Sequence, residues 1–167
     1  YMHILDSEFD RTVNLMRAYV NDEDLMKLST TSEVMPAIER TATVLRVKDQ
    51  MDLLKESSTL IHHAMVFIPM MNRVVSSNSN AIADFDEEMF QALSLPANPL
   101  DYPFTFWKGR AFISVPYGYL HNAPLFLLVV EISSSDITSR LKQFTPEDSM
   151  AVLASRQMAW SSLGATA

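Results

Sequence analysis

Apolar residues in the first third of the chain recur every three or four positions, which is the spacing of one face of an α-helix. The first stripe of this kind consists of Leu5, Phe9, Val13, Met16 and Val20. Most of the charged residues between them lie off the stripe, as expected when one side faces a core and the other faces water. The pattern predicts an amphipathic helix over residues 3–20.

A second long helix is predicted over residues 33–56, which contain no glycine and no proline beyond Pro36. Ser32 is the expected N-cap, and Pro36 falls in the first turn, where its missing N–H costs little. The segment carries two apolar stripes, one formed by Val34, Ile38, Ala42 and Leu45 and the other by Val44, Val47, Met51 and Leu54. We therefore expect one side of this helix to pack on a sheet, and the other on the first helix or on a partner subunit.

Beyond residue 58 the pattern changes to that of β-strands joined by short loops. Residues 59–68 are apolar on both alternating faces, as in a central strand. Further strands are predicted over residues 72–76, 104–108, 110–117 and 125–132, with short helices over residues 84–93 and after residue 133, and a final hairpin from residues 150–154 and 158–161. Short connections favour antiparallel pairing. The predicted class is α+β, with long N-terminal helices packed on a five-stranded antiparallel sheet.

The composition of the chain excludes several classes of function. Only three of its 167 residues are glycine and no two of them have G-x-G spacing, so the sequence holds neither a dinucleotide fingerprint nor a phosphate-binding loop. The chain has no cysteine, which excludes thiol catalysis, disulfides and zinc–thiolate sites. A net charge of −7 without a basic cluster argues against nucleic acid as a partner.

The sequence predicts no membrane-spanning segment and no signal peptide. Its longest strongly apolar run, over residues 124–130, is far shorter than the ~18 residues that a span needs. The first residues lack a basic region followed by an apolar one. We expect both ends to be cut from a longer protein.

No catalytic or metal-binding constellation is predicted. His62 and His63 are neighbours on a strand, so we expect them to point to opposite faces and not to share one metal ion. The other histidines, His3 and His121, add no ligand spacing. The acidic residues around Asp84 lack the calcium-loop pattern, and the sequence has no G-x-S-x-G nucleophile motif. We therefore predict no catalytic residue, no metal and no cofactor.

The segment over residues 102–119 is the strongest pocket candidate, because it combines aromatic side chains with a few polar ones. Arg110 could form a bidentate pair with a carboxylate or a phosphate, and Tyr102 and Trp107 could stack on a sugar or another organic ligand. The predicted ligand-binding residues are Tyr102, Trp107, Arg110 and Ser114, with Phe67 and Arg73 on the neighbouring hairpin. Alternating aromatics are also typical of a sheet core, so both interpretations stay open.

The order of elements and several stretches of sequence resemble the PDC/Cache sensor domains, in which long helices enter a PAS-like antiparallel sheet. The resemblance rests on IHHAMVFIP at residues 61–69, NRVVSS at 72–77, AFISVPY at 111–117, and residues 125–133 followed by 136–141. Domains of this family lie outside the membrane in bacterial sensor histidine kinases, membrane-bound AraC-type regulators and chemoreceptors. The chain looks most like the sensor region of YesM-like kinases.

The resemblance implies a non-catalytic extracellular domain, attached to the cell membrane only through flanking segments. It implies a sensor domain over residues 1–148, with stalk and packing helices over 1–58 and the PAS-like sheet over 59–148, followed by a terminal hairpin or the start of a membrane-proximal module over 149–167. A small ligand, namely a sugar, an amino acid or an organic acid, would bind beside the strands under the loop over residues 77–103. Binding would shift a two-state equilibrium, and the N-terminal helix would carry that shift to a kinase or another output domain.

Two other hypotheses belong to different classes of function. The first is a ligand-free interaction module of a membrane receptor, in which the helix over residues 33–56 forms a homodimer through Val44, Val47 and Met51. The second is a hydrolase, which would require the turnover of a substrate. A thermal-shift screen separates the sensor from the interaction module, because a ligand that binds the folded state raises the melting temperature.

Overall fold

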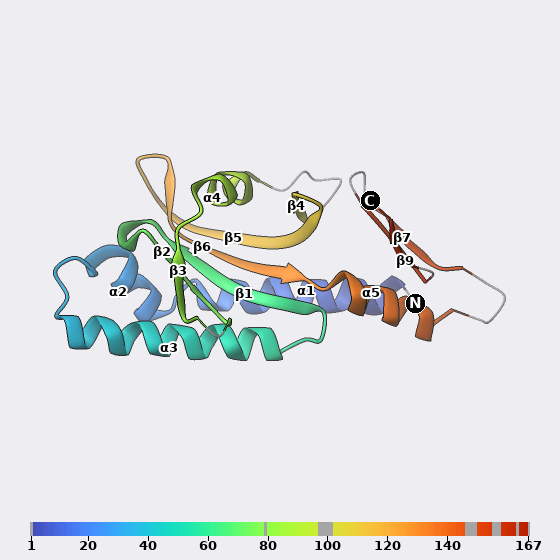
Figure 1. The fold of residues 1–167 in the computed structure, drawn as a ribbon, viewed down its shortest axis with the longest axis horizontal. Coiled ribbons are helices and arrows are strands. Elements are labelled where there is room, and N and C mark those ends of the chain that lie inside the picture. The colour runs from blue at the N-terminus through green and yellow to red at the C-terminus, as the bar shows by residue number, and fades with distance from the viewer. Residues whose placement is uncertain are drawn as a thin grey trace.

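The chain folds around a six-stranded antiparallel sheet, which runs through the middle of the computed structural model (Figure 1). The structure describes residues 2–78, 80–96, 102–145, 150–154, 158–162 and 164–166. The strands lie in the order β3-β2-β1-β6-β5-β4. Their bounds are β1 (Ile61–Ile68), β2 (Arg73–Ser76), β3 (Ile82–Asp84), β4 (Thr105–Trp107), β5 (Arg110–Leu120) and β6 (Ala123–Ile132).

Helices cover both faces of this sheet. Their bounds are α1 (Met2–Tyr19), α2 (Glu23–Thr31), α3 (Ala37–Glu56), α4 (Glu87–Ser94) and α5 (Ser134–Gln143), with a single 3₁₀ turn, η1 (Pro69–Met71), between β1 and β2. The long helices α1 and α3 lie along one face, and the short helix α4 lies on the other (Figure 1). The predicted α+β class, with helices packed on an antiparallel sheet, is confirmed.

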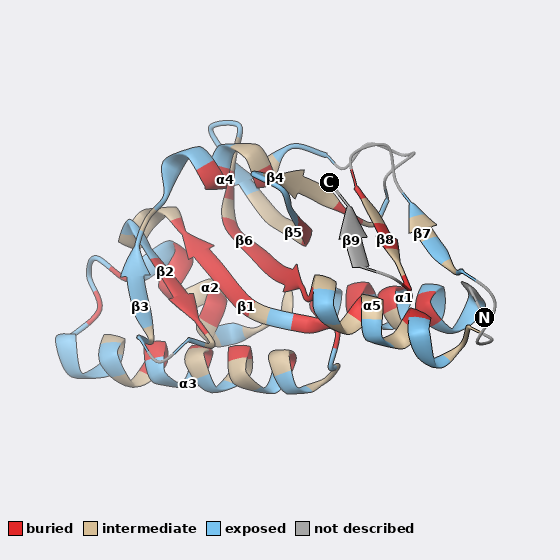
Figure 2. Ribbon diagram, turned by 45° about the vertical axis from the view of Figure 1, so that its right-hand side comes forward, coloured by how far each residue is buried: buried red, intermediate tan, exposed pale blue. Residues whose placement is uncertain are grey.

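The alternation of side chains along the central strands produces two apolar cores. The main core contains Ala64, Val66 and Ile68 from β1, Phe126, Leu128 and Val130 from β6, and the buried stripes of α1 and α3. The second core contains Met65, Phe67, Leu127 and Val129 from the same strands, with Met89, Phe90 and Leu93 from α4. Both faces of β1 and β6 are therefore mostly buried, as Figure 2 shows, and this explains why the two strands read as continuous apolar runs.

The sheet has six strands and not the predicted five, because β3 pairs with the outer edge of β2. All three residues of β3 are exposed, with Ile82 paired to Val75 and Asp84 paired to Arg73. A strand that buries neither face has no alternating pattern, so the sequence gives no signal for it.

The helical first third contains one helix more than the two predicted. Asp22 is the N-cap of this additional helix, α2, because its side chain accepts a hydrogen bond of 2.9 Å from the backbone N–H of Leu25. Ser32 instead ends α2, and Pro36 directly precedes the first residue of α3. The prediction of Ser32 as the N-cap of the second long helix is wrong, because Ser32 is the C-cap of α2 and Pro36 stands at the N-cap position of α3.

Only one of the two apolar stripes predicted on α3 is buried. Val44, Val47 and Met51 lie in the main core against the sheet, and the last two have no exposed surface. Ile38 and Leu45, from the other stripe, are 88% and 52% exposed. The hypothesis of a dimer formed through Val44, Val47 and Met51 is therefore wrong in its residues, because the sheet of the same chain already covers them.

A small second sheet lies beyond α5. It consists of β7 (Val152–Ala154), β8 (Ala159–Ser161) and β9 (Gly164–Thr166), with β7 and β8 antiparallel as the predicted final hairpin requires. Trp160 of β8 is fully buried in the main core, and its indole N–H donates a 3.0 Å hydrogen bond to the hydroxyl of Ser134 at the start of α5. The predicted domain boundary after residue 148 lies outside the described residues.

Among the described helices, none combines the length and the apolar character that crossing a bilayer would require.

Candidate functional site

The face of the sheet under α4 contains most of the strand residues that were predicted to bind a ligand. In register across β1, β6 and β5, Phe67 pairs with Leu127 and Leu127 with Pro116, and the neighbouring row contains Ser114. Asp86 caps α4 by accepting a 2.9 Å hydrogen bond from the backbone N–H of Met89. The apolar side of α4 then fills the middle of this face, so any open volume lies beside the helix.

A cleft opens at the edge of β5, next to the end of α4. The strand β4 pairs only with residues 110–112 of β5, and no described strand pairs with that edge further along. The cleft has a volume of about 300 Å³, at the lower end of what small-molecule pockets offer. It is lined by Val13 and Arg17 of α1, Ser94, Leu95 and Pro96 after α4, Tyr102 and Pro103, and Ile113, Ser114, Val115, Pro116 and Tyr119 of β5. We call this hollow the β5-edge cleft.

The β5-edge cleft combines apolar walls with one positive charge. Arg17 is exposed at the end of α1 and forms no ion pair with any described residue. The hydroxyls of Tyr102 and Tyr119 lie on side chains that are more than half exposed. Ser114 donates a 2.9 Å hydrogen bond to the carbonyl of Leu93, which ties β5 to α4. The cleft therefore suits a small ligand that carries a carboxylate and an apolar part.

Two of the predicted site residues, Tyr102 and Ser114, meet in this cleft. Trp107 and Arg110 are cross-strand partners at the other end of β5. The guanidinium of Arg110 is already engaged by Glu131, with Nε–Oε1 and Nη2–Oε2 distances of 2.7 and 2.5 Å. That hydrogen bonding raises the pKa of Arg110 above its usual value. The predicted carboxylate partner of Arg110 is thus a residue of the same chain.

The other two predicted residues lie apart from the cleft. Phe67 is 1% exposed and packs edge-on against Phe85, with ring centroids 5.6 Å apart, inside the second core. Arg73 pairs with Ile68 of the main core, so it belongs to the opposite face, where its guanidinium lies 3.7 Å from the carboxylate of Asp84. The six predicted residues therefore do not form one site. Parts of the predicted covering loop, residues 79 and 97–101, lie outside the described residues.

Sequence analysis missed Arg17, the only cation that lines the cleft among the described residues. Arg17 lies off the apolar stripe of α1, so the sequence pattern predicts only that it is a helix residue exposed to solvent. Its proximity to Ser114 and Tyr102 results from the packing of α1 beneath β5, which no local pattern encodes.

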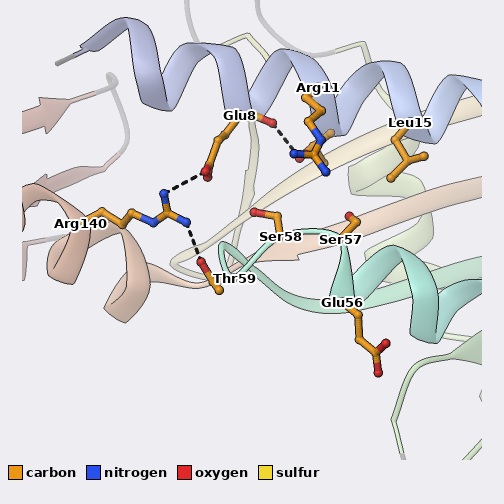
Figure 3. A pocket seen from close by; sticks show the side chains of 9 residues that line it. Glu8, Arg11, Leu15, Glu56, Ser57, Ser58, Thr59 and Arg140 are labelled. Atoms are coloured by element: carbon orange, nitrogen blue, oxygen red, sulfur yellow. Dashed lines mark hydrogen bonds and ion pairs between the residues drawn. The ribbon is translucent and has the colours of Figure 1, made fainter.

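A second, more polar pocket lies where α1, the turn after α3 and α5 meet (Figure 3). Its volume is about 220 Å³. Arg140 of α5 bridges it, with one guanidinium nitrogen 2.8 Å from Oε1 of Glu8 and the other donating a 2.9 Å hydrogen bond to Oγ1 of Thr59. Glu8 of α1 neutralises the charge of Arg140, so the ion pair in this pocket links α1 to α5.

The pairing of β1 with β6 contains a β-bulge at His62. Ile61 pairs with Ile132 and His63 pairs with Glu131, so His62 is an extra residue without a partner on β6. A bulge interrupts the alternation of faces, and the ring centroids of His62 and His63 lie 4.1 Å apart. The prediction that these two histidines point to opposite faces is therefore wrong. Together with Glu131 they form a group, here called the His–Glu cluster, that has the donor types of a metal site.

Comparison with known proteins supports the fold. No protein-family model matches the chain, and no curated protein matches it in sequence. Among solved structures, the ligand-binding domain of the Campylobacter jejuni chemoreceptor Tlp3, in complex with 4-methylisoleucine, matches with a TM-score of 0.59 and 15% identity over 98% of this chain and 63% of that one. The sensory domain of the same receptor without a stated ligand matches with a TM-score of 0.49 and 14% identity over 98% of this chain and 74% of that one.

At such identities the likeness concerns the fold alone. The chain has the fold of a chemoreceptor ligand-binding domain, and it spans 63% of the length of the Tlp3 domain to which it is compared. The predicted sensor-domain fold is confirmed. The finer assignment to YesM-like histidine kinases stays a prediction.

Proposed function

We propose that this chain is the extracellular sensing domain of a membrane receptor, and that it binds a small carboxylate ligand in the β5-edge cleft. The observation that carries the proposal is Arg17, a guanidinium without an ion pair among the described residues, placed over apolar walls in a cleft at the sheet edge. An arginine binds a carboxylate bidentately. Leu95, Ile113 and their neighbours would cover an apolar side chain or carbon skeleton.

An amino acid or an organic acid fits this cleft better than a sugar does. A sugar needs several directed hydrogen-bond partners, whereas the cleft offers one guanidinium, a few hydroxyls and mostly apolar surface. The Tlp3 domain of the same fold is described with 4-methylisoleucine, which combines a carboxylate with a branched apolar chain. Tyr102 and Ser114 belong to the proposed site, and Trp107 and Arg110 flank the same strand at its other end.

The cleft also suggests how binding would be transmitted. Val13 and Arg17 of α1 form one wall, and residues of β5 and of the end of α4 form the others. A ligand in the cleft would therefore favour one position of α1 relative to the sheet. A ligand shifts such an equilibrium only by its different affinities for the two states. We propose that α1 passes this shift to a kinase or another output domain through flanking segments, and that the domain itself makes and breaks no bonds.

The test is a calorimetric and thermal-shift screen with branched amino acids, organic acids and sugars. A hit should bind the Arg17→Gln variant about 10- to 100-fold more weakly, because a hydrogen bond to a charged group contributes about 1.5–3 kcal/mol. The control is Arg11→Gln, on the same helix, whose residue lines the polar pocket and not the cleft. Loss of binding in the Arg11 variant alone would place the ligand in the polar pocket.

A second candidate function is self-association without a ligand, which a specific observation favours. Val34, in the turn before α3, and Ile38, in the first turn of α3, are 83% and 88% exposed, and Leu45 and Leu53 are more than half exposed further along the helix. Burial of these side chains in a homodimer would stabilise it. If no ligand raises the melting temperature and Ile38→Asp converts a dimer into a monomer in analytical ultracentrifugation, self-association replaces ligand sensing as the proposed function.

A further inference from the structure

The His–Glu cluster lies on the α4 face of the sheet, at the opposite end of β5 from the cleft. Because His63, Met65 and Phe67 alternate along β1 on one face, His63 belongs to that face, and its register partner Glu131 belongs to it as well. The bulge brings the ring of His62 beside that of His63. One ligand atom from each of His62, His63 and Glu131 lies within 4.8 Å of the other two.

From this geometry we propose that His62, His63 and Glu131 bind a divalent transition-metal ion of the Zn²⁺ type. Two imidazole nitrogens and a carboxylate oxygen are donors that Zn²⁺ accepts, and a site with three protein ligands keeps a further position for water. Tetrahedral coordination at about 2.0–2.1 Å places ligand atoms about 3.3 Å apart, so the side chains need to close by only about 1.5 Å. His62 is exposed, so a change in its side-chain rotamer, which would supply that movement, displaces no core residue.

The state of His63 favours metal binding. Its Nδ1 is buried and has no hydrogen-bond partner among the described residues. A buried polar atom without a partner is costly, and coordination through this nitrogen would satisfy it.

Arg110 is the positioning residue of the proposed site. Its guanidinium holds both oxygens of the buried Glu131 carboxylate, at 2.7 and 2.5 Å. A carboxylate has about four acceptor positions, so this fork leaves lone pairs for a metal ion while it fixes the orientation of the group. Carboxylates that bind metals are commonly held by such outer hydrogen bonds.

The test is a titration of the tag-free protein with zinc chloride, followed by calorimetry and by the melting temperature. We expect one ion per chain, a raised melting temperature, and no response to Ca²⁺ or Mg²⁺, which prefer oxygen ligands. Cobalt(II) in place of zinc should give the intense visible absorption of a four-coordinate site. The single variants His62→Gln and His63→Gln should weaken zinc binding by at least about tenfold. Even the loss of a residue that only hydrogen-bonds to a metal ligand commonly lowers metal affinity by that factor.

The chain provides its own controls, because its other histidines are His3 and His121. The double variant His3→Gln, His121→Asn should bind zinc as the parent does. His62 is exposed and unpaired in the sheet, so its variant should fold even if changes at Glu131 do not. Arg110→Gln should weaken binding less than loss of a ligand does. Zinc binding that survives the loss of both His62 and His63, or no binding at millimolar zinc, would falsify the proposal.

Discussion

On one face of the main sheet lie two helices of 18 and 20 residues, and on the other lies α4, with eight. At 1.5 Å per residue α4 is about 12 Å long, whereas the 11 residues of β5 extend over about 36 Å. The long helices cover their face with an apolar core (Figure 2). The short helix covers only the middle of its face and leaves two open ends.

The two candidate binding sites border these two ends. One end borders the β5-edge cleft, to which α1 contributes Arg17 at the edge of the sheet, and the other end holds the His–Glu cluster with Arg110. Burying charged groups under a long apolar helix would cost free energy without a partner to offset it. The face covered by the long helices α1 and α3 therefore provides stability, whereas the ends that α4 leaves uncovered are available for binding.

The largest expected effect lies on the helix-covered face. Leu54→Ala removes a fully buried side chain from the main core and should lower the free energy of unfolding by about 2–5 kcal/mol. The matched control is Leu53→Ala, one residue away on α3 and 62% exposed, which should change it by less than about 0.5 kcal/mol. Urea denaturation measures both. Equal effects would mean that α3 does not pack as described.

On the other face, Glu131→Gln should lower the free energy of unfolding by about 1–3 kcal/mol in metal-free buffer, because it breaks the fork with Arg110 at a buried position. The control is the exposed ion pair of Arg73 with Asp84, whose nitrogen and oxygen lie 3.7 Å apart. Arg73→Gln should have no measurable effect on the free energy of unfolding. Equal changes in the free energy of unfolding would mean that the pair of Glu131 with Arg110 stabilises the fold no more than an exposed ion pair does.

A smaller effect is expected where β5 meets α4. Ser114→Ala removes the hydrogen bond to the carbonyl of Leu93 and should cost about 1 kcal/mol. Ser94→Ala is the matched control, since the hydroxyl of Ser94 bonds only within its own helix, to the carbonyl of Phe90. Thermal unfolding of both variants shows whether this contact between the helix and the sheet holds α4 in place.

The smallest expected effect concerns the ion pair between Asp24 of α2 and Arg46 of α3. A hydrogen bond from Arg46 holds the pKa of Asp24 below its usual value. A carboxylate with a lowered pKa stabilises the folded state above its unfolded pKa, and this contribution disappears as the pH falls through the folded value. Asp24→Asn should therefore cost about 0.5 kcal/mol at neutral pH and nothing in strong acid, which urea denaturation at both pH values would show.

The long helices and the central strands were predictable because each buries a periodic set of apolar residues. Thus α1 follows from the stripe that begins at Leu5, and β1 from the apolar run that ends at Ile68. The same principle explains the misses. The strand β3 buries nothing, and α2 is a nine-residue helix between the two predicted long helices, too short to show several turns of apolar spacing.

The candidate site was predictable only in part. Tyr102 and Ser114 belong to a segment whose composition already indicated a pocket. Arg17 reaches that pocket only through tertiary packing. The bulge at His62 contains no glycine that would mark it, so the strict alternation of an ideal strand gave the wrong faces for the two histidines.

The bulge also bears on how β1 tolerates a change in its length. Ile61 pairs with Ile132 and His63 with Glu131, so His62 takes no part in the pairing of β1 with β6. Deletion of that single codon would leave every cross-strand partner in place and would restore an unbroken pleat. Sheet architecture alone therefore gives no reason to keep this residue, and a selective reason for keeping it would have to come from what its imidazole does.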